Sequence, residues 1–130
     1  MKAIIEVKQL GETFKDARRR LAENLRRRQE ADYHLSYESA RDLCAELTPA
    51  RMDVLRTLRE MGAGSVRALA EAAGRNYSNV HTDVARLIAL GLIERLDDGT
   101  VRVPFDEIDI RVVQSPQALA AQEQITAVAA

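Results

Sequence analysis

Polar side chains recur at helical spacing between residues 75 and 86 of this 130-residue chain. Asn79, Thr82 and Arg86 are three and four positions apart, so a helix places them on one face. Asparagine can pair with adenine, arginine with guanine, and a hydroxyl with either a base or a phosphate. These residue types at this spacing therefore predict a surface that contacts double-stranded DNA. Its predicted members, one of them from a later hairpin, are Arg75, Tyr77, Ser78, Asn79, Thr82, Arg86 and Arg102.

The other side of the same helix is apolar and is expected to face a protein core. At about 100° per residue, the predicted inward residues are Tyr77, Val80, Val84, Leu87 and Ile88. For Tyr77 a second role stays open, because its hydroxyl at the start of the helix could contact a phosphate. Asp83 lies beside the polar arc, where we expect it either to act as a cap or to pair with a neighbouring arginine. No carboxylate occupies the middle of that arc, which favours contact with phosphates.

Three helices and a hairpin are predicted to position this surface. Thr48–Pro49 combines a hydroxyl cap with proline at the first helical position, which is a strong signal for a helix start. Glycines at the ends of the apolar patterns are expected to stop the helices, and Gly91 is expected to adopt the left-handed conformation. The predicted helices run from Thr48 to the stop at 62–64, from Ser65 to Gly74 and from Asn76 or a neighbour to about Ala89.

The predicted hairpin joins strands Leu92–Leu96 and Thr100–Phe105 through Asp97-Asp98-Gly99. Asp-Gly between apolar runs is one of the stronger short hairpin signals. Arg102 and Arg95 could reach a phosphate or the adjacent minor groove from these strands. The two aspartates at the tip would repel phosphates, so we expect a short wing that contacts the DNA backbone lightly or not at all.

The order of these elements over Thr48–Phe105 is that of a winged helix-turn-helix. The turn at Gly74–Arg75 is short enough to set the second and third helices at a steep angle, which lets the third project into a major groove. The predicted fold class is therefore mainly α with a small β component (α+β). Within it, the winged helix-turn-helix follows an N-terminal extension that contains a strand and a helix.

Four short segments carry a resemblance to a known family. They are Leu47-Thr48-Pro49-Ala50-Arg51, Ser65-Val66-Arg67-Ala68-Leu69-Ala70, Asn79-Val80-His81-Thr82-Asp83-Val84 and Leu90-Gly91-Leu92-Ile93. In these segments the chain resembles the MarR-type winged-helix regulators, and more narrowly a branch of small prokaryotic transcriptional regulators with a similar Val-His-x-Asp-Val pattern. Some members of that branch look like antitoxins encoded beside a small toxin. The resemblance implies a winged-helix fold and DNA binding.

Residues 1–47 are predicted to form an extension with two short strands and a basic helix. Strands are expected at Ile4–Val7 and from Asp32 to Tyr37, and helices at about 12–30 and 38–47. Residues 15–28 contain seven basic and two acidic groups, a net charge of +5. This charge has three open interpretations, namely a solvated helix face, an arm on DNA phosphates and a surface for an acidic partner protein. The residues expected to bind a partner or a second protomer are Phe14, Arg19, Leu21, Leu25 and Arg26.

The chain after the hairpin is expected to hold one more strand and a tail. Residues 106–114 are predicted to form a half-buried strand, because Ile108, Ile110 and Val112 alternate with charged residues. Residues 115–130 are rich in alanine and glutamine without a consistent apolar face, and are expected to be a flexible tail. The predicted domain organisation is thus 1–47, 48–105, 106–114 and 115–130.

Composition and motifs exclude several classes of protein. The net charge of -1 argues neither for nor against a nucleic-acid partner. The single cysteine, Cys44, excludes an internal disulfide and a cysteine-based zinc site, and its apolar surroundings predict burial. No apolar run approaches the roughly 20 residues that span a bilayer, so a cytoplasmic location without membrane contact is expected. No phosphate loop, paired nucleophile or ligand cluster is present, so we expect no enzyme, no metal and no cofactor.

Two functions stay open for the winged helix. In the first, the protein is a sequence-specific transcriptional regulator, a repressor that binds a pseudo-palindromic site as a homodimer. An extension of this hypothesis makes it the autoregulating antitoxin of a toxin–antitoxin pair, with its outer segments covering a small cognate toxin. In the second, the winged helix is a protein-interaction module that does not bind DNA, which the near-neutral charge and the acidic wing tip favour.

Overall fold

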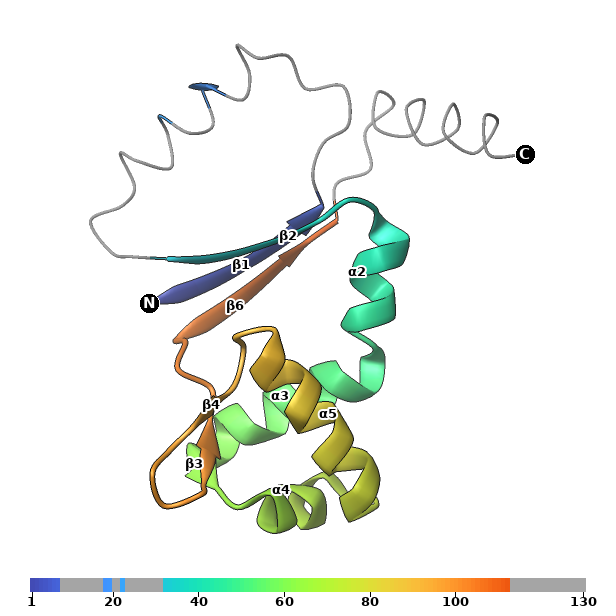
Figure 1. The fold of residues 1–130 in the computed structure, drawn as a ribbon, viewed down its shortest axis with the longest axis vertical. Helices are drawn as coiled ribbons and strands as arrows, with labels where there is room; N and C mark the ends of the chain where they lie inside the picture. Colours follow the sequence, from blue (N-terminus) through green and yellow to red (C-terminus); the bar gives the residue numbers. More distant parts are fainter. Residues whose placement is uncertain (8–17, 20–21, 23–31, 113–130) are drawn as a thin grey trace. The chain divides into compact units, whose positions relative to one another are not determined.

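The computed structural model describes residues 1–7, 18, 19, 22 and 32–112, and the chain divides into two units (Figure 1). One unit combines Met1–Leu43 with Glu107–Ala130, and the other is Cys44–Asp106. Of the described helices, none is long and apolar enough to cross a lipid bilayer. Because residues of the first unit both precede and follow the second, the second unit is an insertion into the sequence of the first. Each unit is described by itself below.

Several predicted features lie outside the described residues. They are most of the helix expected at 12–30, including Phe14, Leu21, Leu25 and Arg26, and the tail at 115–130. Arg19 is described, and it is helical and exposed together with Arg18 and Ala22.

Three parallel strands form the sheet of the first unit. They are β1 (Lys2–Val7), β2 (Tyr33–Tyr37) and β6 (Glu107–Arg111). The central strand β1 pairs in parallel with both neighbours, and the register places Ile5 opposite Leu35 and Ile110. One face of the sheet is consequently apolar, and Ala3 and Ile5 on it are fully buried. The sequence predicts all three strands but not their pairing, because β6 follows β1 only after the whole winged helix.

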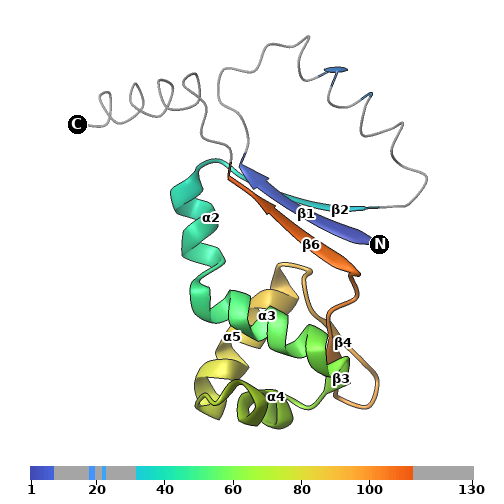
Figure 2. The same ribbon diagram turned by 180° about the vertical axis from the view of Figure 1, so that it is seen from behind.

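The second unit is a winged helix-turn-helix, which confirms the predicted α+β fold. Its elements are α3 (Pro49–Met61), β3 (Ala63–Gly64), α4 (Val66–Ala73), α5 (Tyr77–Ala89), β4 (Glu94–Arg95) and β5 (Val101–Arg102). Figure 2 shows α3, α4 and α5 grouped as the helical part of this unit, and each of the three contacts the other two. The short strands form an antiparallel sheet in the order β3-β5-β4.

Each helix of the winged helix begins at a side chain that accepts a backbone N–H. Thr48 accepts from Arg51 at 3.2 Å, Ser65 from Ala68 at 3.1 Å, and Asn76 from Ser78 at 2.8 Å. These bonds satisfy donors that the first turn of a helix cannot pair internally. α4 ends at Gly74, whose φ of 65° lies in the left-handed region that glycine adopts without strain. The helix starts predicted from the capping residues are thus confirmed.

Aliphatic side chains from all three helices form the core of the second unit. Its helical members are Val54, Leu55, Leu58, Leu69, Ala70, Val80, Val84 and Leu87. The prediction that α5 buries Val80, Val84 and Leu87 is confirmed, but the inward position of Tyr77 is wrong. Tyr77 is 43% exposed, because the first residue of the helix lies beyond the core. Its ring contacts Arg67 and His81 instead, at 5.0 Å and 5.8 Å from the ring centroid.

One strand of the wing sheet was not predicted. Gly62 turns the chain after α3 with a φ of 86°, and Ala63 and Gly64 then pair with Arg102 and Val101 of β5. Two residues are too few to show an alternating pattern, so the sequence indicates only a helix stop at this point.

The two predicted wing strands are shorter than expected. In the first, only Glu94–Arg95 is strand, because the backbone N–H groups of Leu92 and Ile93 donate to the carbonyl of Leu87 in α5 instead of to a neighbouring strand. In the second, only Val101–Arg102 pairs, and Pro104 has no N–H to extend the ladder.

α2 (Ala40–Glu46) begins in the first unit and ends in the second. It is shorter than the predicted helix at 38–47, and Leu43 is its buried residue. Cys44 was predicted to be buried and is exposed, because consecutive helix residues point about 100° apart and Leu43 takes the inward direction.

Asn76→Ala is expected to lower the free energy of unfolding by about 1 kcal/mol, because it removes the cap of α5. In a domain of this size the loss corresponds to roughly 4–8 °C in Tm, measured by circular dichroism. Asn79→Ala makes the same change on the exposed face of α5 and should stay within about 0.5 kcal/mol of the wild type. Equal losses in the two variants would contradict the capping role of Asn76.

Candidate nucleic-acid interface

The exposed face of α5 is polar and carries no carboxylate. Ser78, Asn79 and Thr82 are exposed, and the side chain of Arg86 is 46% exposed. Thr82 Oγ1 donates to the carbonyl of Ser78 at 3.0 Å, so the lone pairs of the hydroxyl remain available as acceptors. A helix face with short polar side chains and no acid is suited to the floor of a major groove.

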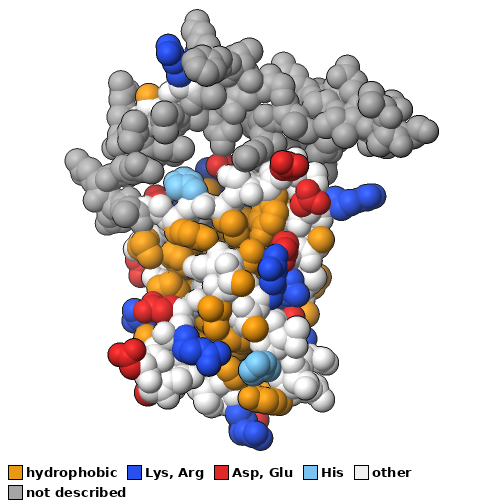
Figure 3. Space-filling view, in the orientation of Figure 1, with side chains coloured by type: hydrophobic (Ala, Val, Ile, Leu, Met, Phe, Trp, Pro, Cys, Tyr) orange, Lys and Arg blue, Asp and Glu red, His pale blue; other side chains and the backbone are white. Residues whose placement is uncertain are grey.

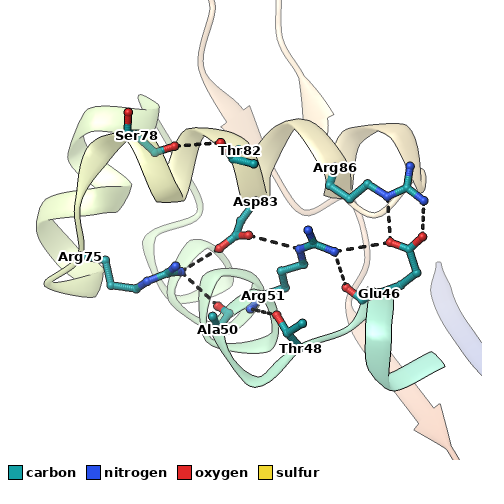
Figure 4. A network of polar contacts seen from close by, with 9 residues as sticks. All are labelled: Glu46, Thr48, Ala50, Arg51, Arg75, Ser78, Thr82, Asp83 and Arg86. Atoms are coloured by element: carbon teal, nitrogen blue, oxygen red, sulfur yellow. Dashed lines mark hydrogen bonds and ion pairs between the residues drawn. The ribbon is translucent and has the colours of Figure 1, made fainter. Parts of the chain in front are cut away.

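Asp83, the acidic residue of α5, is turned away from this face and paired with two arginines (Figure 4). Its Oδ1 accepts from Arg51 Nε at 3.2 Å, and its Oδ2 lies 3.0 Å from Arg75 Nη1. Only 14% of the Asp83 side chain is exposed. The predicted pairing of Asp83 with a neighbouring arginine is confirmed. Since Arg51 belongs to α3 and Arg75 to the turn before α5, the two contacts fix the rotation of α5 about its axis.

Arg75 is part of this structural network rather than of the exposed face. Besides Asp83, its Nη1 donates to the carbonyl of Ala50 at 3.4 Å, and its side chain is only partly exposed. The sequence predicts Arg75 as a DNA-contacting residue on the polar arc, whereas in the structure its guanidinium is bound to Asp83 and to the Ala50 carbonyl.

Glu46, the last residue of α2, binds the guanidinium of Arg86. Arg86 Nε donates to Glu46 Oε2 at 2.8 Å, and Arg86 Nη2 donates to Oε1. Arg51 Nη1 lies 3.4 Å from the same Oε2 and donates to the Glu46 carbonyl at 2.9 Å. The hydrogen bond from Arg86 holds the pKa of Glu46 below its ordinary value. Sequence reasoning missed Glu46, because it is 40 positions from Arg86 and only the fold brings them together.

The wing offers DNA little free positive charge. Arg102 Nε donates to Glu94 Oε2 on the neighbouring strand at 3.3 Å, and both side chains are exposed. Asp98 at the tip accepts from the hydroxyl and the backbone N–H of Thr100, which lowers the pKa of Asp98 and keeps it ionised. Arg95 is exposed and has no acidic partner within the described part of the chain.

Charges of both signs are interspersed over the winged helix. In the lower part of Figure 3, basic and acidic side chains lie among one another and form no continuous basic patch on the face shown. Arg67 stacks on Tyr77 at the start of α5 and adds one cation there. Among the described residues, no three His, Cys, Asp or Glu side chains gather as a metal ion would require.

Comparisons relate the chain to known proteins. The family model described as HVO_A0114 matches residues 46–110, which is half of the 130 residues. The structure of NolR from Sinorhizobium fredii is 19% identical, with a TM-score of 0.42 over 68% of this chain and 82% of that one. A structure on the regulation of DNA binding of Bordetella bronchiseptica BpsR by 6-hydroxynicotinic acid is 20% identical, with a TM-score of 0.40 over 87% and 74%. A comparison with curated proteins finds no match.

Asp83→Asn is expected to lower the free energy of unfolding by about 1–3 kcal/mol, because it leaves the partly buried Arg75 without a carboxylate and Arg51 with that of Glu46 alone. Asp53→Asn is the matched control, since Asp53 forms an exposed pair with Arg56 at 3.4 Å and should cost less than about 0.5 kcal/mol. Urea denaturation measures both values. An equal cost at the two positions would contradict the role assigned to Asp83.

Glu46 is expected to stabilise the fold only while it is ionised. Because its pKa is lowered in the folded state, the contribution is fully present above the ordinary value of 4.5 and is lost as pH falls through the folded-state pKa. The Tm difference between wild type and Glu46→Gln should therefore be largest near neutral pH and shrink below that value. Thermal unfolding from about pH 7 to about pH 3 tests this, and a difference that widens on acidification would exclude it.

Proposed function

This chain belongs to the family described as HVO_A0114, and we propose that the protein binds double-stranded DNA and regulates transcription. The observation that carries the proposal is the exposed face of α5, where Ser78, Asn79 and Thr82 stand without a carboxylate. Asp83 supports the same arrangement, since its two arginines keep that face outward. In a winged helix-turn-helix this helix is the element that enters the major groove.

Several exposed residues of α5 have a chemical role in this proposal. Asn79 is placed to pair with an adenine edge through its amide. Thr82 donates inward to Ser78, so its hydroxyl accepts from an amino group of adenine or cytosine. Arg86 contacts guanine or a phosphate once it leaves Glu46. Tyr77 at the start of α5 and Arg67 of α4, which lies over its ring, contact the phosphate backbone beside the groove.

We further propose that the protein is a homodimeric repressor in the cytoplasm and not an enzyme. One α5 contacts only a few base pairs, and a second copy on a two-fold axis doubles the contacts and requires two half-sites about one helical turn apart. Light scattering of the free protein and of its complex with DNA gives both the oligomeric state and the stoichiometry. A monomer that binds DNA one to one would contradict the dimer.

The antitoxin role is a narrower hypothesis with one supporting observation. The segment Asn79–Val84 carries the Val-His-x-Asp-Val pattern of regulators that include antitoxins. The identity of the neighbouring gene is the first test of this hypothesis. If no small toxin-like gene lies beside it, the hypothesis loses its support.

A protein-interaction module is the second candidate function. It is favoured by the ion pairs that occupy Arg86 and Arg102 and by Asp97 and Asp98 at the wing tip. On this alternative the α5 face binds a protein surface, and no salt-dependent DNA binding is observed.

Combined Asn79→Ala and Arg86→Ala substitution is expected to weaken binding to the upstream region of the protein's own gene by roughly 10- to 100-fold, because one contact to a base edge and one to a guanine or a phosphate are lost. Fluorescence polarisation at several salt concentrations measures it, with random-sequence DNA as competitor. Arg56→Ala removes one arginine from α3, where it pairs with Asp53, and should bind nearly as the wild type. Equal affinities of the double variant and the wild type would show that α5 is not the recognition helix.

A further inference from the structure

We propose that Glu46 restrains Arg86 in the free protein and competes with DNA for its guanidinium. This inference rests on the proposed function, because it concerns how the α5 face engages DNA. It assigns Glu46, at the end of α2, a role in setting the affinity of a contact made by another helix.

The contact geometry is the first reason. Arg86 uses Nε and Nη2 to bind the two carboxylate oxygens of Glu46. The same two-donor edge of an arginine binds a phosphate or the O6 and N7 of guanine. Arg86 therefore cannot make a two-bond contact through that edge with DNA until Glu46 gives it up.

The charge network makes this exchange inexpensive (Figure 4). When Arg86 leaves, Glu46 retains Arg51, whose Nη1 lies 3.4 Å from Oε2 and also binds the Glu46 carbonyl. Arg51 is held in place by its own bond to Asp83. The carboxylate is therefore not left without a cation, and the contacts of Asp83 with Arg51 and Arg75 do not include Arg86.

Exposure identifies Arg86 as the member that can move. Its side chain is 46% exposed, whereas those of Arg51 and Asp83 are 19% and 14% exposed. While Arg86 is paired with Glu46, the two charges cancel and the α5 face gains no net charge. When Arg86 is released from Glu46, it places one positive charge close to a phosphate or a guanine. Glu46 therefore lowers the affinity for any DNA that uses Arg86.

The test compares the binding of wild type and Glu46→Gln to the same DNA, each also in an Arg86→Ala background. Glu46→Gln is expected to bind roughly two- to fivefold more tightly, the value of one partly exposed ion pair, with a salt dependence steeper by about one ion. In the Arg86→Ala background it should change nothing. Glu60→Gln, the same charge change on α3, is the matched control and should bind as the wild type.

Parallel titrations with specific and random-sequence DNA identify the group that replaces Glu46. A gain on both DNAs indicates a phosphate, and a gain on the specific site alone indicates a base. Thermal unfolding verifies that the variants fold. Should Glu46→Gln be unstable, Glu46→Asp retracts the carboxylate while keeping its charge, and tighter binding is again expected.

Three outcomes would overturn the inference while leaving DNA binding intact. Weaker binding by Glu46→Gln would indicate that Glu46 orients Arg86 for its contact with DNA. An equal gain in the Arg86→Ala background would mean that the carboxylate repels phosphates directly. Unchanged affinity would mean that the pair does not compete with DNA. Failure of every protein, wild type included, to bind DNA would instead refute the proposed function and this inference with it.

Discussion

The arrangement of the α5 face depends on one partly buried ion-pair network, in which the carboxylate of Asp83 binds two guanidinium groups. Arg51 comes from α3 and Arg75 from the turn before α5, so the interaction ties three elements together. Aliphatic packing alone allows a helix to rotate slightly, whereas a charge at the edge of the core must keep its partners. Ser78, Asn79 and Thr82 face outward because Asp83, on the same helix, is held inward.

Arginines of this winged helix serve different purposes although their sequence contexts look alike. Arg75 and Arg51 are structural, since each is partly buried and bound to Asp83. Arg102 is compensated across the wing by Glu94. Arg86 stands between these cases, exposed and yet bound by Glu46. The number of arginines therefore says little about the positive charge available on the surface, because neighbouring carboxylates neutralise part of it.

Features that depend on neighbouring residues could be predicted from the sequence, and features that depend on contacts between distant residues could not. Helix starts at Thr48, Ser65 and Asn76 are set by hydrogen bonds that span two or three residues, and these predictions are confirmed. The alternation in β6 also predicts a strand, but the sequence does not show that this strand pairs with β1, because pairing depends on the whole chain between them. Glu46 was missed for the same reason. The periodic pattern predicts that Tyr77 faces the core, but the residue is exposed, because a periodic pattern does not show where the core ends along the helix.

The insertion of the winged helix between strands of one sheet has a consequence for the order of folding. β6 can join β1 only when the chain between them has closed into a loop, and the entropy cost of closure grows with the length of unstructured chain. Once Cys44–Asp106 has folded, much of that chain no longer adds to the entropy cost of closing the loop. Local contacts within the helices also form faster than pairings between distant strands. We therefore expect the winged helix to fold first and the parallel sheet last, so that a complete sheet reports a correctly folded insertion.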